Sequence, residues 1–250
     1  MEFSIVIPAY NEASVIVKTL SNMTSFMRSF SKSFEIIVVD DGSTDETANL
    51  AEAYSKDHPE VGVIRNPHKG KGYTVRTGML AASGDLIMMA DSDGAMPIEE
   101  LKRLVIWVKE HNFDIVIGSR EGIGAVRKNE PFIRHLMGRV FNLIIKILVL
   151  PGIEDTQCGY KLFKHKAAKD VFERLVLFGP NTPEIKVPRV SAFDVEVLFI
   201  ARKFKYKIKE VPVIWNYIKT VRVHPIRDSI QNFLDVLKVK VNDLKGLYKF

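Results

Sequence analysis

Short apolar runs alternate with amphipathic stretches over the first 120 residues of this 250-residue chain. Five runs rich in Ile, Val, Leu or Met have the length and composition of strands buried on both faces. They lie at residues 3–8, 35–40, 61–65, 85–90 and 114–119. Apolar positions at helical spacing predict helices between them, over residues 13–30, 44–56, 72–82 and 97–111. This alternation predicts an open, doubly wound α/β fold with a mostly parallel sheet.

The pattern changes after residue 120. We expect helices over residues 131–150, 166–175 and 193–203, a strand over 206–215, and a Pro-containing loop over 179–188. Residues 226–247 form a last amphipathic stretch, whose apolar positions recur at helical spacing. The basic and apolar residues of 131–150 and 226–247 make both helices candidates for contact with a membrane surface, or for packing on the core.

Composition narrows the class of protein. With 46% hydrophobic and 26% charged residues, the chain has the composition of a globular protein rather than a disordered one. The single Cys158 excludes an intrachain disulfide and a Cys-based zinc site. The chain starts without the basic and long apolar segments of a signal peptide, and it contains no 18-residue apolar run. We therefore expect a protein of the cytosol.

Charge is distributed unevenly. Residues 1–118 hold 11 Lys and Arg against 17 Asp and Glu, whereas residues 119–250 hold 25 against 13. An acidic first half suits a metal-bound ligand, and a basic second half suits a phosphate-rich partner such as a nucleic acid or an anionic membrane.

The candidate chemistry lies where the predicted strands end. Asp91, Ser92 and Asp93 directly follow the fourth strand, and two carboxylates two residues apart can share one Mg²⁺ or Mn²⁺ with a diphosphate. Ligands of parallel α/β sheets bind at this edge. The ends of the first three strands and the loops that follow them supply further candidate binding residues, namely Pro8, Tyr10, Glu12, Asp40, Asp41, Lys69 and Lys71. Neither a dinucleotide-binding G-x-G-x-x-G nor a P-loop motif occurs.

Four motifs in order now carry a resemblance. V-I-P-A-Y-N-E, V-V-D-D-G-S-T-D, G-K-G-x-x-V-R-x-G and D-x-D resemble the inverting family 2 glycosyltransferases of the GT-A fold, over residues 3 to about 216. The blocks at residues 118–120, 155–163 and 193–196 are similar to the dolichyl-phosphate glucosyltransferases and, next to them, the dolichyl-phosphate mannose synthases. The D-T-Q-C-G-Y-K-L-F block favours the glucosyl branch.

The resemblance implies a nucleotide diphosphate sugar as donor, UDP-glucose ahead of GDP-mannose, and a polyprenyl or dolichyl phosphate as acceptor. Carried over, the first two loops hold the nucleoside, and Asp91 and Asp93 bind the metal and the diphosphate. Arg120 faces the donor phosphates or the acceptor. The relatives carry a G-x-S-K-type basic element after the last core strand, which this chain lacks, so Lys219 or Arg222 is the expected substitute.

A phosphate acceptor needs cations more than a strong base, because its second pKa is about 6 and it is already ionised near neutral pH. Arg127, Arg134 and Arg139 are candidates to bind that phosphate. Asp155 and Asp194 are candidates to position the acceptor or to act as a base.

Alternatives to this hypothesis remain. A glycosyltransferase acting on a sugar hydroxyl would need a base, for which Asp194 is available. A non-catalytic nucleotide-sugar binding module is disfavoured by the two metal-type carboxylates, and a nucleic-acid partner by the lack of a mixed aromatic and basic surface. A polysaccharide synthase would need a Q-x-x-R-W motif, which is absent.

The expected organisation is a glycosyltransferase domain over residues 1–225, with a nucleotide-sugar half (1–118) and an acceptor half (119–225). Residues 226–250 form the C-terminal helix. Since the relatives often carry a membrane anchor and no such segment is expected here, attachment would come from the protein surface, on the cytosolic face of a membrane. The oligomeric state stays open.

Overall fold

The computed structural model describes residues 1–187, 191–218 and 225–249, and of Pro225 and Ile226 only the backbone. Seven strands form its central sheet: β1 (Phe3–Ala9), β2 (Phe34–Asp40), β3 (Val61–Arg65), β4 (Leu86–Met89), β5 (Ile115–Ser119), β7 (Lys161–Lys164) and β8 (Ile208–Pro212). Their order across the sheet is β3-β2-β1-β4-β7-β5-β8. Only β7 runs antiparallel to its neighbours, β4 and β5, so the prediction of a mostly parallel α/β sheet is confirmed.

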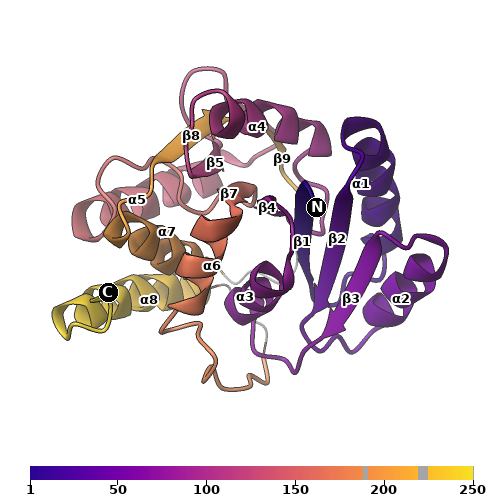
Figure 1. Ribbon diagram of the computed structural model, residues 1–250. Helices are drawn as coiled ribbons and strands as arrows, with labels where there is room; N and C mark the ends of the chain where they lie inside the picture. The colour runs from indigo at the N-terminus through magenta and orange to yellow at the C-terminus, as the bar shows by residue number, and fades with distance from the viewer. Residues whose placement is uncertain (188–190, 219–224, 250) are drawn as a thin grey trace.

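Helices cover both faces of the sheet, as Figure 1 shows. One core cluster lies under α1 (Ile16–Phe30), α2 (Thr47–Asp57), the short η1 (Ile98–Glu100) and α4 (Leu101–Lys109). The other lies under α3 (Lys71–Ala81), α5 (Phe132–Leu148), α6 (His165–Glu173), α7 (Phe193–Lys203) and α8 (Pro225–Leu244). The strands feed both clusters because successive side chains point to opposite faces: in β1, Ile5 and Ile7 join the first cluster and Val6 the second.

Two strand predictions need correction. The sequence pattern missed β7, which inserts between β4 and β5, because its antiparallel pairing depends on strands far away in the chain. The single strand expected over residues 206–215 is divided into β8 and β9 (Ile214–Asn216), and β9 pairs with β6 (Val126–Lys128) in a second, two-stranded sheet. The division follows Pro212, which has no backbone N–H to donate to a neighbouring strand.

The sheet draws strands from both halves of the chain, and the N-terminal half supplies four consecutive ones. Figure 1 places α5, α7 and α8 at the end of the molecule away from β3. Among the helices in the described part of the chain, none is long and apolar enough to cross a bilayer.

Candidate active site

A pocket of about 390 Å³ opens where β1, β2 and β4 end. It brings together eleven of the residues expected from the sequence: Pro8, Tyr10, Glu12, Asp41, Lys71, Asp91, Ser92, Asp93, Arg120, Arg134 and Asp194. His68, Gln157 and Phe193 also line it. The carboxyl edge of the parallel strands therefore collects the polar groups of successive loops, as expected for this kind of sheet.

Two stacked rings lie in this pocket. The Tyr10 and His68 rings are 4.2 Å apart and within 11° of parallel. His68 Nδ1 lies 2.8 Å from Asp41 Oδ2 and, since a carboxylate only accepts, this nitrogen donates its hydrogen. Asp41 also accepts hydrogen bonds from the backbone N–H groups of Lys69 and Gly70. It thus fixes the loop that presents His68, a residue the sequence did not single out because its partner lies 27 positions away.

The two candidate metal ligands differ in their electrostatic surroundings. Burial opposes ionisation of Asp91, but the Lys71 ammonium, 2.5 Å from Asp91 Oδ1, outweighs it and lowers the pKa of that carboxyl. Burial and the nearby charge of Asp91 raise the pKa of Asp93. Asp93 accepts a hydrogen bond from the backbone N–H of Ala95, and the intervening Ser92 is buried, its carbonyl bonded to Thr19.

Because Gly159 has no side chain, the Asp91 carboxylate can occupy the space beside it. A Cβ atom built on Gly159 would lie 2.0 Å from Asp91 Oδ2, far inside van der Waals contact. The glycine of the C-G-Y sequence is therefore required by the position of a carboxylate that follows another strand.

The two carboxylates fit the ligand preference of a divalent cation. Asp91 and Asp93, two positions apart after β4, offer carboxylate oxygens. Hard oxygen ligands of this type are the ones that Mg²⁺ and Mn²⁺ prefer. In the described ranges, no group of three or more His, Cys, Asp or Glu side chains is placed to hold a metal ion. The remaining ligands would thus come from a diphosphate and water.

Arg120 enters the pocket from the end of β5 and is held by Asp155. Its Nε and Nη2 each donate to a different Asp155 oxygen at 2.8 Å, and its backbone N–H donates to the same carboxylate. Asp155 is completely buried; burial opposes its ionisation, but the Arg120 charge and hydrogen bonds lower its pKa to about 2. Asp155 does not line the pocket, so the expectation that it acts as a base on the acceptor needs correction: it positions Arg120.

Asp194, at the start of α7, reaches the pocket but has a buried partner. Lys161 is completely buried in β7, and its ammonium donates to Asp194 Oδ1 and to the carbonyl of Cys158. One oxygen of the candidate base is thus already occupied by a cation. Lys161 lies within the D-T-Q-C-G-Y-K-L-F block, and sequence reasoning did not identify its role.

The three candidate acceptor arginines lie in different places. Arg134 lines the pocket, with its guanidinium 5.0 Å from the centre of the Tyr217 ring. Arg127 is paired with Glu121 and Glu130 outside the pocket, and Arg139 lies on the surface beside Glu121.

Two nucleotide-site candidates, Asp40 and Lys69, lie outside the pocket lining. Asp40 is buried and accepts the backbone N–H of Ser43, and the Lys69 ammonium lies over the Tyr73 ring. Neither side chain lines the pocket, because Asp40 turns into its own loop and Lys69 turns towards α3. Lys219 and Arg222 fall outside the described residues.

Comparison with known proteins identifies the family. The sequence model of glycosyl transferase family 2 matches residues 4–172, more than half of the chain. The chain belongs to glycosyl transferase family 2. A dolichyl-phosphate beta-glucosyltransferase of Trichomonas vaginalis is 35% identical, with 97% of this chain and 72% of that protein aligned. The Dictyostelium discoideum protein of the same name is 32% identical (98% and 76%), and the human one 30% identical (99% and 78%).

Solved structures show the same fold for this family 2 enzyme. Glucosyl-3-phosphoglycerate synthase from Mycobacterium tuberculosis, crystallised with Mn²⁺, UDP-glucose and phosphoglyceric acid, has a TM-score of 0.63 at 19% identity, over 96% of this chain and 80% of that one. A Pyrobaculum calidifontis mannosyltransferase in complex with GDP-Man and Mn²⁺ has a TM-score of 0.60 at 19% identity. This chain covers 64% of that mannosyltransferase, and 95% of this chain is aligned. The GT-A-type fold expected from the motifs is thereby confirmed.

Proposed function

We propose that this family 2 glycosyltransferase transfers glucose from UDP-glucose to a dolichyl or other polyprenyl phosphate, with inversion at the anomeric carbon. The observation that carries the proposal is the composition of the pocket. It combines a carboxylate pair for a metal-bound diphosphate with two arginines, Arg120 and Arg134, for a second phosphate. The names of the relatives, which match this chain over nearly its whole length, support glucose and dolichyl phosphate as the transferred sugar and the acceptor.

The donor fits the first half of the pocket. The stacked rings of Tyr10 and His68 offer a flat surface to the base, next to Pro8 and Glu12. Asp91 and Asp93 would hold Mg²⁺ or Mn²⁺, which when bound neutralises charge on the leaving diphosphate. Lys71, paired with Asp91 in this structure, is a further cation beside the same phosphates.

The acceptor fits the second half. Its phosphate is ionised near neutral pH, and an oxygen of it attacks the anomeric carbon as the bond from that carbon to the diphosphate breaks. Arg120 and Arg134 offset the repulsion between acceptor and donor phosphates. No proton has to be removed from the nucleophile, which agrees with a buried Asp155 and with an Asp194 held by Lys161.

The long hydrocarbon chain of the acceptor is insoluble in water and stays in a membrane, so the enzyme must reach the acceptor phosphate at the membrane surface. We therefore propose that the enzyme works on a membrane surface, on the cytosolic face, where nucleotide sugars are available.

The test is a donor and acceptor screen with the full chain. UDP-glucose, GDP-mannose and UDP-N-acetylglucosamine are each paired with a short-chain dolichyl phosphate and with a free sugar, in Mg²⁺, Mn²⁺ or EDTA. We expect transfer from UDP-glucose to the phosphate, and none in EDTA. A tenfold higher kcat/KM with GDP-mannose, equal to about 1.4 kcal/mol, would overturn the choice of donor.

The metal assignment has its own variants. We expect Asp91→Asn and Asp93→Asn each to lower turnover about a hundredfold or more, because metal stabilisation of a leaving group contributes several kcal/mol. Asp57→Asn, at an exposed carboxylate ending α2, is the matched control and should keep full activity.

The free-sugar arm of the screen tests the alternative acceptor. If the enzyme transfers glucose to the free sugar, and Asp194→Asn abolishes that transfer, the result would support a sugar hydroxyl as the acceptor.

A further inference from the structure

Helix α5 turns its large apolar side chains towards solvent. Phe132, Ile133 and Ile147 are 77%, 72% and 73% exposed, and only Asn142 and Ile145 of the helix are buried. Four more apolar residues of α5 are also exposed, namely Leu136, Met137, Val140 and Leu143. A helix that packs on a globular core by its apolar stripe would show the opposite arrangement.

Helix α8 repeats this inversion. Its inner face packs on the core through Val236 and Val239, but it also buries three polar residues, Asp228, Asn232 and Asp235. Its exposed side carries Ile230, Phe233, Leu234, Val241 and Leu244, the last 77% exposed. The apolar stripe of this helix is therefore available to something outside the chain.

The two helices form one surface. They pack against each other, and Figure 1 shows both at the end of the molecule away from β3. We call the exposed apolar residues of α5 and α8 named above the α5–α8 surface. It holds most of the large exposed apolar side chains of the described chain, and such a concentration marks a contact site rather than ordinary protein surface.

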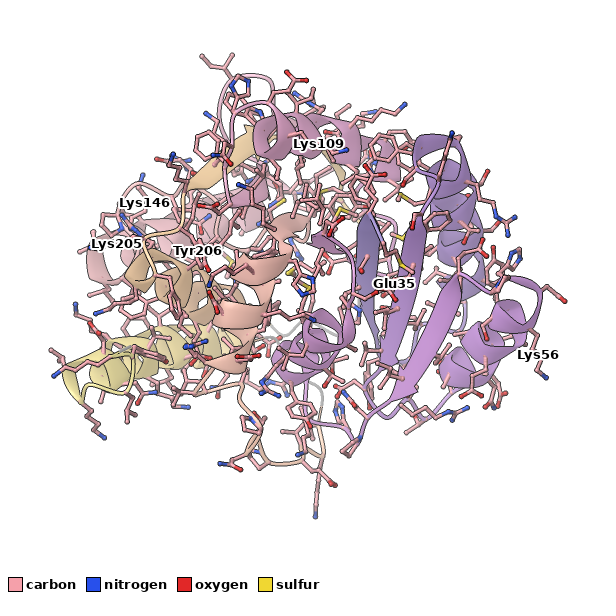
Figure 2. All side chains as sticks on the ribbon, viewed as in Figure 1. Glu35, Lys56, Lys109, Lys146, Lys205 and Tyr206 are labelled. Atoms are coloured by element: carbon pink, nitrogen blue, oxygen red, sulfur yellow. The ribbon has the colours of Figure 1, made fainter. Side chains whose placement is uncertain are left out.

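The charged side chains of these helices are also divided by face, with cations on the exposed side and acidic residues on the inner side. In the described part of both, every exposed charged side chain is a cation: Arg134, Arg139, Arg227, Lys238 and Lys240. The acidic residues turn inward: Asp228 and Asp235 are buried beneath Arg227 and Lys238, with which they pair, and Asp243 is paired with Lys203. Lys146 of α5, labelled in Figure 2, is paired with Glu154. Two copies joined through this surface would face cation with cation, whereas an anionic lipid layer would be complementary.

We infer that the α5–α8 surface docks on an anionic lipid bilayer, with its apolar side chains in the interface and its cations among the headgroups. Arg134 connects this surface to the pocket, because it lies on α5 and lines the pocket as well. An acceptor in the docked state can keep its hydrocarbon chain in the bilayer while its phosphate reaches Arg134. The inference rests on the proposed function for its acceptor, but docking itself requires no reaction.

The test measures binding of the full chain to vesicles in the absence of substrates. Vesicles of phosphatidylcholine alone are compared with vesicles that also contain phosphatidylglycerol, in a flotation assay at low and high salt. The double variant Ile147→Gln/Leu244→Gln removes one exposed apolar side chain from each helix. The matched control, Val17→Gln/Ile106→Gln, changes exposed apolar residues of α1 and α4, outside the α5–α8 surface.

We expect the wild type and the control to bind phosphatidylglycerol vesicles, with binding weakened by salt because screening shortens the range of the charges. The α5–α8 variant should bind about tenfold or more weakly, because it lacks two exposed apolar side chains that docking would bury in the bilayer. With a vesicle-borne long-chain acceptor its kcat/KM should fall by a similar factor, and with a short water-soluble acceptor it should equal that of the wild type. Circular dichroism should show the same fold, since both replaced side chains are exposed.

Three results would overturn docking. The first is equal vesicle binding by the wild type and the α5–α8 variant, and the second is no vesicle binding by either. The third is a wild-type dimer in sedimentation velocity that this variant dissociates, which would assign the surface to a second copy. Vesicle binding without any glucosyl transfer would leave docking in place and refute only the proposed function.

Discussion

Gly159 makes clear how much a residue without a side chain contributes to this site. Sequence reasoning placed it in a block similar to the dolichyl-phosphate glucosyltransferases but gave it no task of its own. In the structure, the Asp91 carboxylate fills the space where a Cβ atom of residue 159 would lie, at 2.0 Å. The position of a metal-type ligand after β4 thus depends on a glycine just before β7.

We expect Gly159→Ala to displace the Asp91 carboxylate and to lower turnover about a hundredfold, the effect of misplacing a reacting group by roughly 1 Å. The fold should survive, because the clash is with the end of a side chain. Steady-state kinetics across a Mg²⁺ or Mn²⁺ titration would measure the effect. Gly62→Ala in β3, where nothing lies within 4 Å of the added Cβ, is the matched control. Wild-type turnover in Gly159→Ala would refute the dependence.

Three segments of the second half of the chain meet at one ion pair, whose carboxylate is completely buried. Arg120 follows β5, Asp155 lies in the loop before β7, and Glu210 of β8 accepts the backbone N–H groups of Glu154 and Asp155. The Arg120 guanidinium also lies 5.3 Å from the centre of the Trp215 ring in β9. The pair therefore joins both sheets and at the same time orients a pocket cation.

We expect Asp155→Asn to lower the free energy of unfolding by about 3 kcal/mol at pH 7, because Arg120 loses a buried partner. The folded pKa of Asp155, about 2, lies below its unfolded value of about 3.9. Its contribution to stability is thus complete above about pH 4 and is lost as the pH falls towards 2.

Urea unfolding of wild type and variant between pH 7 and pH 2 would measure this. The difference between the two should be constant from pH 7 to about pH 4 and should then shrink. Glu52→Gln, which breaks an exposed pair with Arg65, should differ little from wild type throughout. A difference that stays constant down to pH 2 would contradict the assignment.

At the scale of the whole molecule, the segment that follows α8 is hydrogen-bonded to α7, the helix whose first residues line the pocket. Tyr248, almost completely buried, donates a hydrogen bond from its hydroxyl to Glu196 of α7 at 2.6 Å. Burial raises the pKa of Glu196, and its carboxylate also accepts the backbone N–H groups of Val176, Leu177 and Phe178. Anchoring through Tyr248 holds α8 on the protein by its inner face and leaves the α5–α8 surface outward.

We expect Tyr248→Phe to lower the free energy of unfolding by about 2 kcal/mol, the effect of losing a buried hydrogen bond to a carboxylate. Activity on a short soluble acceptor should stay unchanged, since Tyr248 does not line the pocket. Urea unfolding and steady-state kinetics would measure the two quantities. Tyr54→Phe, in α2, is the control, and an equally small loss in both variants would argue against the anchor.

The amino-acid sequence by itself determined the strands of the first half of the chain and the loops that carry the candidate site residues. Apolar runs and helical periodicity are local, so β1 to β5 and the helices between them followed from short windows of sequence. The placement of Tyr10, Asp41, Asp91 and Asp93 in one pocket followed as well, because parallel strands end at a common edge.

Only the tertiary structure decided which groups pair. His68 with Asp41, Lys161 with Asp194 and Arg120 with Asp155 are 27, 33 and 35 positions apart, and no spacing in the sequence connects them. These pairings turned Asp155 from a candidate base into the residue that orients Arg120. The insertion of β7 likewise depended on partners distant in the chain.

Which face of each amphipathic helix packs on the core also depended on the tertiary structure. Helical periodicity establishes that α5 and α8 each have an apolar side, but an apolar side is equally suited to a protein core and to a lipid surface. The choice depends on what the opposite side can bury. In α8 the core accepts Val236 and Val239 together with Asp228 and Asp235, so the helix packs by a mixed face and its larger apolar side chains face outward.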